Sequence, residues 1–330
     1  MRKKILTILL LLLIVEAMAV GGWCAPLRDR TMVTVTDKLG RRMEVPVPVQ
    51  GTVFLSLYEL IPVFGLWDRV LGLNRWAFDN TVLKRCPGLQ GIPAVGTGME
   101  VNAEAILALH PELVITWSYR PEVTEYLARK GLRVIAVYPE SLEELYEVIE
   151  MCGRLFGKEE RAKAVRSRMD ELFSLVTLRV ADIPPERRRK VLWLWQKPTR
   201  VTGRIGLQQD LITLIGAVNP AAGVENAHAE VSIERVLTWD PDVVFIWGHA
   251  SYGTDHLVRS SQWQAVKAVK DGRVFKAPII DSWSPSTGVL TLWMAQKTYP
   301  EAFQGIDLGE IARQFHQECF GVPLAGGIFE

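Results

Sequence analysis

The sequence is poor in the residues that build disulfide frameworks and structural metal sites. Its 330 residues include four cysteines and five histidines, and their density and spacing are too low for either kind of site. Cys24, Cys86, Cys152 and Cys319 permit one disulfide without requiring any. Charge of either sign is also not in excess, because the formal net charge is +1. That balance gives no electrostatic case for binding nucleic acid.

Long apolar runs are scarce as well, and the one that stands out lies at the N-terminus. Basic residues at positions 2–4 precede an apolar stretch from Ile5 to Val15 that Thr7 interrupts. This stretch is shorter than the roughly 20 residues that span a membrane, and residues 17–19 provide a small-x-small cleavage site. We therefore predict that residues 1–19 are a signal peptide. The alternative is an uncleaved N-terminal anchor.

The expected mature chain is exported to the periplasm or to the outer face of the cytoplasmic membrane. Cys24 follows the predicted cleavage site, but Trp23 before it does not resemble a lipobox, so lipidation is a minor alternative. Without residues 1–19 the chain has 35 basic and 36 acidic residues. The remaining length suffices for two lobes of about 100 to 200 residues each.

Short apolar strands and helical segments alternate along this chain. A hairpin is predicted at 31–46, around Asp37-Lys38-Leu39-Gly40. Further strands are predicted at 53–55, 71–73, 113–117, 133–137, 191–195, 243–247 and 273–276. Helical segments are predicted at 58–66, 103–109, 122–130, 142–156 and 207–215, with an amphipathic one at 290–299. Strands and helices in alternation are typical of parallel sheets.

One helical segment is much longer than the others. Residues 158–180 contain neither proline nor glycine, and their apolar side chains recur at helical spacing until Pro184 and Pro185 end the pattern. We predict an α/β fold of two Rossmann-like lobes, with mostly parallel sheets, joined by one long α-helix. The predicted bounds are 31–157 for the N-terminal lobe, 158–183 for the linking helix and 188–330 for the C-terminal lobe.

An internal repeat supports two lobes of similar construction. Residues 101–118 align without a gap to residues 231–248. The identical pairs are Val101 and Val231, Glu104 and Glu234, Leu107 and Leu237, Pro111 and Pro241, Val114 and Val244, and Trp117 and Trp247. Each copy predicts a capped helix, a proline turn and a buried strand.

The two ends of each copy suit different tasks. Glu104 and Glu234 fall in the first turn of a predicted helix, where a carboxylate complements the helix dipole. Trp117 and Trp247 fall at the carboxyl ends of predicted strands, where open α/β sheets bind their ligands. The alternative role for both tryptophans is to cover the hydrophobic cores.

Other aromatic and polar side chains follow the predicted strands, and we expect them to line the same cleft. They are Tyr58, Tyr119, Arg120, Lys197, His249, Tyr252 and Trp283, and Arg204 is a further cationic candidate. The cationic members can meet carboxylates, phenolates or a bare oxyanion with charge-assisted hydrogen bonds.

Together these segments resemble the iron-siderophore, heme and cobalamin class of ABC-importer binding proteins, from about residue 31 to 303. The resemblance rests on the order and spacing of VGTGMEVNAEAILALHPELVITW, LQQDLITLIGAVNPAAG and SSQWQAVKAVKDGRVFKAP. It implies a monomer without a cofactor that opens and closes only slightly. It also implies a permease dimer with its ATPase subunits as partner, docked through Glu104 and Glu234.

The resemblance leaves the ligand open. Trp117 matches a position where cobalamin binders place an aromatic ring against the ligand. His228 stands where those binders have another aromatic residue, and an imidazole there favours a metal centre, a heme iron or an anion. We predict a metal chelate, an iron siderophore or heme, with a corrinoid or a molybdate-type oxyanion as alternatives. His228 is a candidate metal ligand or else a hydrogen-bonded loop residue.

Two functions of other classes compete with this prediction. A zinc or manganese receptor needs three or four His and carboxylate ligands, and the sequence has five histidines and no His-rich loop. An exported hydrolase would fit the same frame, but the sequence has no Gly-x-Ser-x-Gly elbow, phosphate-binding glycine loop or His-Glu-x-x-His helix. We predict a binding protein and not an enzyme.

Overall fold

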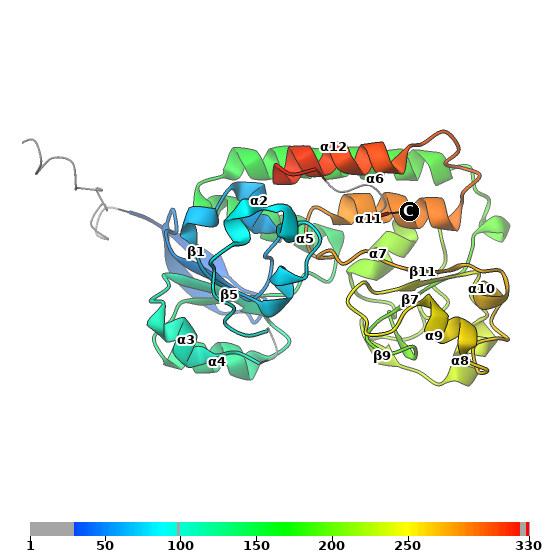
Figure 1. The fold of residues 1–330 in the computed structure, drawn as a ribbon, viewed down its shortest axis with the longest axis horizontal. Coiled ribbons are helices and arrows are strands. Elements are labelled where there is room, and N and C mark those ends of the chain that lie inside the picture. The colour runs from blue at the N-terminus through cyan, green and yellow to red at the C-terminus, as the bar shows by residue number, and fades with distance from the viewer. Residues whose placement is uncertain (1–29, 98–99, 324–327, 330) are drawn as a thin grey trace, which may run out of the picture.

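The computed structural model describes residues 30–97, 100–323 and 328–329. The predicted signal peptide and Cys24 lie outside the described residues. Two α/β lobes lie side by side and are joined along one side by long helices (Figure 1). The predicted fold class is confirmed. No helix of the described part is both long and apolar enough to cross a membrane.

The N-terminal lobe has a four-stranded parallel sheet. Its strands lie in the order β4 (Val70–Leu73), β3 (Thr52–Phe54), β5 (Leu113–Trp117) and β6 (Val134–Val137). All of β3, β5 and β6 is buried, as expected of parallel strands with helices on both faces. The helices of this lobe are α2 (Leu60–Phe64), α3 (Ala103–Ala108), α4 (Pro121–Arg129) and α5 (Leu142–Phe156).

The predicted hairpin is present at the edge of this lobe. Strands β1 (Thr31–Thr36) and β2 (Arg42–Val47) pair antiparallel. The buried carboxylate of Asp37 accepts hydrogen bonds from the backbone N–H groups of Leu39 and Arg41, which close the turn. It also accepts from the backbone N–H of Ala136 at 3.2 Å, so the turn is fixed to β6.

The C-terminal lobe has a mixed five-stranded sheet. Its order is β11 (Val274–Lys276), β10 (Val243–Ile246), β7 (Val191–Leu194), β8 (Arg200–Val201) and β9 (Ala229–Glu230). The first three strands are parallel, and β8 and β9 are antiparallel to their neighbours. The helices of this lobe are α7 (Leu207–Leu214), α8 (Ile233–Trp239), α9 (Thr254–Arg259) and α10 (Lys267–Lys270). The sequence did not predict β8 or β9, because two-residue strands have no periodicity.

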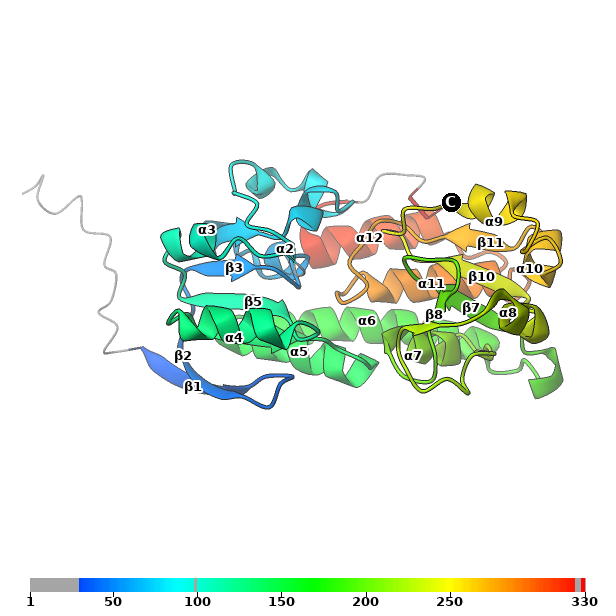
Figure 2. The same ribbon diagram turned by 90° about the horizontal axis from the view of Figure 1, so that it is seen from below.

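Three helices form a layer along one side of both lobes (Figures 1 and 2). They are α6 (Glu159–Val180), α11 (Thr287–Thr298) and α12 (Leu308–Phe320), and α11 packs against both others. The prediction that the segment at 290–299 is amphipathic is wrong. Ten residues of α11 are buried, because helices and lobes surround it, and a helix enclosed in this way is apolar on all sides. α12 also contacts α2 of the N-terminal lobe.

Both copies of the internal repeat fold as helix, turn and strand. The side chains of Asn102 and Ser232 cap α3 and α8 by accepting a hydrogen bond from the backbone three residues later. His110 and Asp240, each directly before the proline of its copy, adopt left-handed backbones with φ of 47° and 44°. Non-glycine residues adopt this conformation rarely, so the same chain reversal joins helix to strand in both lobes.

Candidate functional site

A cavity of about 380 Å³ lies between the lobes and is lined by residues from both. Strand ends supply much of its wall. Trp117 ends β5, and Tyr138, Trp195 and Trp247 directly follow β6, β7 and β10. The carboxyl ends of parallel strands in the two lobes therefore meet at one space, in agreement with the general rule for open α/β sheets.

The cavity brings together eight of the eleven side chains that the sequence predicts for ligand contact. They are Tyr58, Trp117, Tyr119, Arg120, His228, Trp247, His249 and Trp283. Tyr58 follows Leu57, whose φ of 56° places a buried branched residue in the left-handed region. Such a strained backbone is common where a functional side chain must be aimed.

Lys197, Arg204 and Tyr252 do not line the cavity, because each is engaged elsewhere. Lys197 lies 3.8 Å from the carboxylate of Glu230 and is mostly exposed. Arg204 pairs with Glu225 on the surface at 2.5 Å. The Tyr252 hydroxyl donates to the backbone oxygen of Trp195 at 2.8 Å, so it supports a cavity residue from behind. Position after a strand does not by itself place a side chain in the cleft.

Sequence reasoning missed further wall residues, chiefly Trp76, Tyr138, Trp195, Arg200 and Asp281. Tyr138 directly follows a predicted strand, so the strand-end rule would have found it. The predicted strand at 191–195 includes Trp195, whereas β7 ends at Leu194. Trp76 lies in the 3₁₀-helix η3 (Arg75–Phe78), Arg200 lies in the two-residue strand β8, and Asp281 lies in the irregular segment before α11. No periodic pattern indicates these three.

The aromatic rings of the wall contact one another across the cleft. Trp283 lies in the segment between β11 and α11, with its ring centroid 5.1 Å from Trp117 and 5.3 Å from Tyr138. Trp76 of the N-terminal lobe lies 6.5 Å from Trp247 of the C-terminal lobe. The indole Nε1 of Trp283 also donates to the backbone oxygen of Pro139 at 2.9 Å. The lobes are therefore in contact around the cavity.

Two guanidinium groups give the cavity its positive charge. Arg120 forms an ion pair with Glu122, which offsets its charge. Arg200 forms no ion pair or side-chain hydrogen bond with any residue in the part of the chain that the structure describes. Burial, with the Arg200 charge as a further cause, lowers the pKa of His228 to about 4. The imidazole is therefore neutral at ordinary pH, and Arg200 is the uncompensated cation of the site.

Three buried polar atoms of cavity residues lack a hydrogen-bond partner among the described residues. They are Nε1 of Trp117, Nδ1 of His228 and Oδ2 of Asp281. Such unsatisfied atoms are uncommon in folded proteins, and each requires an explanation such as a ligand or a bound water. These three atoms give the cavity residues hydrogen-bonding capacity that no described protein group uses.

Asp281 belongs to a buried carboxyl pair that joins the lobes. Glu59, which precedes α2 and is fully buried, accepts hydrogen bonds from Asn80 at 2.6 Å and from the backbone N–H of Asp281 at 2.7 Å. Its other oxygen accepts from Ser284 at 2.5 Å and Ser286 at 2.6 Å. Burial and the nearby charge of Glu59 raise the pKa of Asp281 to about 8. Asp281 is therefore mainly protonated at neutral pH and presents a donor.

No group of three or more His, Cys, Asp or Glu side chains suited to hold a metal ion occurs among the described residues. Cys86, Cys152 and Cys319 are buried free thiols. His228 has one ring nitrogen engaged, because its Nε2 lies 2.5 Å from the Tyr138 hydroxyl. The site is therefore better suited to a ligand that brings its own donor and acceptor groups than to a bare cation.

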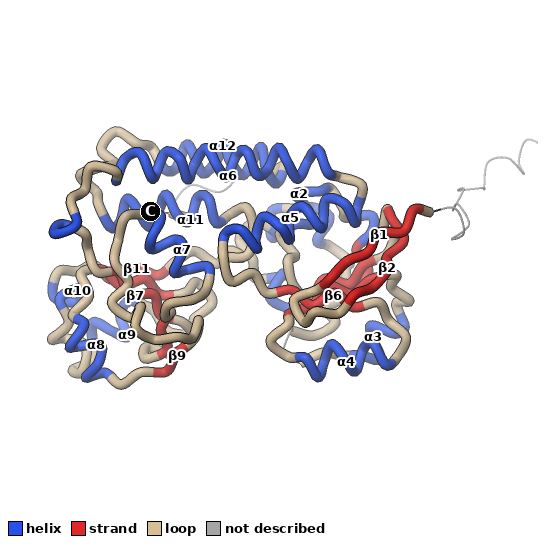
Figure 3. Tube along the Cα trace, turned by 180° about the vertical axis from the view of Figure 1, so that it is seen from behind, coloured by secondary structure: helices blue, strands red, loops and turns tan. Residues whose placement is uncertain are grey.

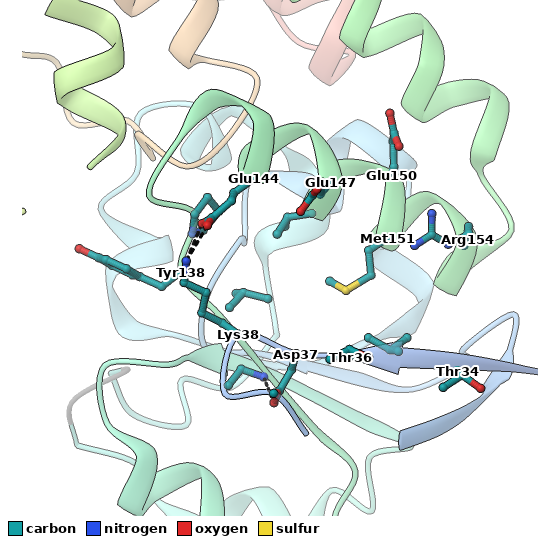
Figure 4. A pocket seen from close by; sticks show the side chains of 16 residues that line it. Thr34, Thr36, Asp37, Lys38, Tyr138, Glu144, Glu147, Glu150, Met151 and Arg154 are labelled. Carbon is teal, nitrogen blue, oxygen red and sulfur yellow. Dashed lines mark hydrogen bonds and ion pairs between the residues drawn. The ribbon is translucent and has the colours of Figure 1, made fainter. Parts of the chain in front are cut away.

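A second and larger groove, of about 590 Å³, lies on the N-terminal lobe between the β1–β2 hairpin and α5 (Figure 4). Lys38 crosses it to bond Glu144 at 2.7 Å and to meet Glu140 at 3.0 Å. Tyr138 borders this groove as well, but its side chain points away from the other labelled residues. Carboxylates outnumber cationic side chains in this groove, and residues of one lobe alone line it, so the cleft lined by both lobes is the better candidate site.

Comparison with known proteins decides the family. A family model described as periplasmic binding protein matches residues 47–279. The chain belongs to this family. Its solved relatives share the whole architecture: CeuE of Helicobacter pylori, with Ni(II) bound, has a TM-score of 0.81 at 24% sequence identity, covering 88% of this chain and 96% of that chain. MolA of Haemophilus influenzae, bound to molybdate, has a TM-score of 0.77 at 20% identity, covering 89% and 99%.

Curated relatives of the binding protein are binding proteins as well. The molybdate-binding protein MolA of Haemophilus influenzae is 24% identical over 325 residues, which is 87% of this chain and 90% of that protein. A vitamin B12-binding protein of Vibrio cholerae is 26% identical over 251 residues, which is 74% of this chain and 86% of that protein. The prediction of a family of ABC-importer binding proteins is confirmed.

Proposed function

We propose that this binding protein captures a compact, oxygen-rich anionic metal chelate, such as a small ferric complex, in the cleft between its lobes. The observation that carries the proposal is the unpaired Arg200 at the same cavity as three unpartnered polar atoms of Trp117, His228 and Asp281. A guanidinium and three donors form charge-assisted and neutral hydrogen bonds to ligand oxygens. Such a set favours an anion over a cation.

The size and walls of the cavity narrow the ligand further. Its volume of about 380 Å³ lies near the lower end of the 300 to 1,000 Å³ that ligand pockets commonly have. Eight tyrosine and tryptophan side chains line it, and aromatic faces pack against flat apolar groups. A small chelate with planar organic arms offers both the oxygens and the faces that this wall can contact. A corrinoid is less favoured, because its bulk exceeds this space.

A bare oxyanion of the molybdate type is the second candidate. It is favoured by the donors at the cavity wall, and by the similarity to the molybdate-binding protein along 87% of this chain. A tetrahedral oxyanion would use the donors but would leave most aromatic faces without a partner. The effect of removing an aromatic ring therefore distinguishes the two candidates.

Delivery to an ABC permease and its ATPase subunits completes the proposed function. Glu104 and Glu234 are exposed in the first turns of α3 and α8, one on each lobe. We propose that these carboxylates dock on the two permease subunits, that the signal peptide exports the chain, and that the chain acts as a monomer without turning over its ligand. A single carboxylate on each lobe suits a partner with two equivalent subunits.

The decisive experiment is native mass spectrometry of the protein purified from the envelope of its own cells. We expect an adduct whose isotope pattern identifies a metal. Calorimetric titrations with ferric citrate, a ferric catecholate, molybdate and cobalamin then rank the ligand classes. Saturable binding of cobalamin alone, or hydrolase turnover of generic esters, would contradict the proposal.

A further inference from the structure

Tyr138 and His228 meet across the cleft, although they belong to different lobes. Tyr138 follows β6 in the N-terminal lobe, and His228 precedes β9 in the C-terminal lobe. Their Oη and Nε2 atoms lie 2.5 Å apart, and both side chains line the cavity. The 2.5 Å contact requires the lobes to be close together, because each partner is fixed to its own lobe.

The direction of this hydrogen bond follows from the protonation of its two partners. Burial raises the pKa of the Tyr138 hydroxyl far above its ordinary value, so the hydroxyl keeps its proton. Burial also keeps His228 neutral, with a pKa lowered to about 4. A neutral imidazole has one protonated and one unprotonated nitrogen. If Tyr138 donates, Nε2 must be the unprotonated nitrogen.

The other ring nitrogen, Nδ1, then carries the hydrogen. Nδ1 is buried and has no hydrogen-bond partner within the described residues. Trp195 packs against the imidazole with a centroid distance of 4.2 Å, which limits the rotation of the ring. Nδ1–H is therefore a fixed donor without a hydrogen bond among the described residues, in a side chain that lines the same cavity as Arg200.

We propose that Tyr138 is a positioning residue that sets ligand specificity: its hydroxyl, by donating across the cleft to Nε2 of His228, holds the imidazole in the Nδ1–H form that donates to an oxygen of the ligand. This inference rests on the proposed function only for the class of ligand. It gives His228 the role of a donor to oxygen, in place of the candidate metal ligand predicted from the sequence. Neither nitrogen then has a lone pair free for a metal.

The contact across the cleft therefore sets the donor before a ligand binds. When the lobes separate, Tyr138 leaves Nε2, and the imidazole is free to exchange tautomers in water. When they close, the tautomer is selected and the donor is presented. The hydroxyl of Tyr138 thus acts through His228 without having to touch the ligand.

Nuclear magnetic resonance tests the tautomer without any ligand. Long-range proton–nitrogen correlation spectra of ¹⁵N-histidine-labelled protein show which ring nitrogen is protonated, and His228→Gln assigns the signals. We expect Nδ1–H in the wild type and a mixture of tautomers in Tyr138→Phe. Tyr126→Phe, the same change at a half-exposed tyrosine outside the cavity, should leave the tautomer as it is. An Nε2–H imidazole in the wild type would overturn the inference.

Titration of ferric citrate and molybdate tests the consequence for binding. Loss of about one neutral hydrogen bond predicts a 3- to 10-fold weaker affinity in Tyr138→Phe, carried mainly by faster dissociation. Unchanged affinity and tautomer in Tyr138→Phe would refute the role of Tyr138. If neither probe binds the wild type, the proposed ligand class fails, while the resonance experiment still decides whether Tyr138 sets the tautomer.

Discussion

Trp195 and Trp283 lie nearly parallel at the cavity, with an angle of 9° between their ring planes and 6.2 Å between their centroids. One belongs to the C-terminal lobe and the other to the segment that leads into the helical layer. Trp195 is almost fully buried, so Trp283, which it supports, is the indole of the pair that a planar group can reach. We propose that this arrangement favours ligands with flat faces.

Removal of one of these rings should therefore separate the two candidate ligands. We expect Trp283→Ala to weaken binding of a ferric catecholate at least 10-fold, the scale of a lost aromatic contact and its buried area. Binding of molybdate should change much less, because an oxyanion gains little from a ring face. Calorimetry with both probes measures these affinities in Trp283→Ala. Trp239→Ala, at a residue outside the cavity, is the control. Equal losses for both probes would contradict the preference for a flat ligand.

Arg200 should supply the dominant electrostatic contribution to binding. We expect Arg200→Gln to weaken binding of anionic probes about 10- to 100-fold, since hydrogen bonds to charged groups contribute about 1.5 to 3 kcal/mol. The dependence of affinity on salt should also decrease. Arg204→Gln is the matched control, because Arg204 is paired with Glu225 outside the cavity. Similar effects of both substitutions would show that overall charge, and not the site, governs binding.

Asp281 should make binding sensitive to alkaline pH. Its pKa is raised to about 8 by burial and by the charge of Glu59, so its acid form donates below that pH. Above it, the ionised carboxylate loses the donor and repels an anion. We expect affinity for ferric citrate to be constant from pH 6 to 7 and to fall as pH rises through 8. Asp281→Asn should flatten this profile, whereas affinity that rises with pH would contradict the assignment.

His316 should make the fold sensitive to acid. It is fully buried in α12, and burial lowers its pKa from 6.5 to about 4. Between these two pH values, His316 is therefore protonated in the unfolded chain and neutral in the folded chain. The contribution of neutral His316 to the free energy of unfolding is complete above pH 6.5. It is lost as pH falls towards 4, by up to about 1.4 kcal/mol per pH unit.

Denaturant unfolding at several pH values measures this contribution. His316→Asn keeps a side-chain donor but does not titrate, so the free energy of unfolding should fall less steeply with acid than in the wild type. His256→Gln replaces an exposed histidine and should keep the wild-type slope. An unchanged slope in His316→Asn would show that other groups cause the acid sensitivity.

Glu104 and Glu234 should matter for transport and not for binding. We expect Glu104→Ala combined with Glu234→Ala to abolish uptake into cells while the affinity of the purified protein for its ligand stays the same. Each carboxylate is exposed and interacts with its short helix only weakly through the dipole, so the fold should tolerate both changes. A matching loss of ligand affinity would place the two residues in the structure of the site instead.

Much of the fold was predictable because its elements carry strong local patterns. Residues 113–117 and 142–156 were predicted with the bounds that β5 and α5 have, since one is a buried apolar run and the other has a serine cap and a terminal glycine. α11 was misjudged for the opposite reason. Its enclosure by α6 and α12 is a tertiary relationship, and periodicity within a segment does not report it.

The site was predictable only where strand ends define it. Trp117 and Trp247 follow from the repeat and the strand-end rule, whereas Asp281 reaches the cavity through an irregular segment held by Glu59, more than two hundred residues earlier in the chain. Lys197 satisfied the same rule, yet it turns outward to Glu230. The position of a residue after a strand fixes the end of the sheet at which it lies, but not whether its side chain points into the cavity.

The helical layer of α6, α11 and α12 seen from behind in Figure 3 has a consequence for the permease. Because both lobes are attached to the same stiff support, separating them cannot greatly alter the outline of the molecule. The empty and occupied forms would then differ chiefly in the spacing between Glu104 and Glu234. A transporter that contacts both lobes would then distinguish the empty form from the occupied form by the distance between these two carboxylates.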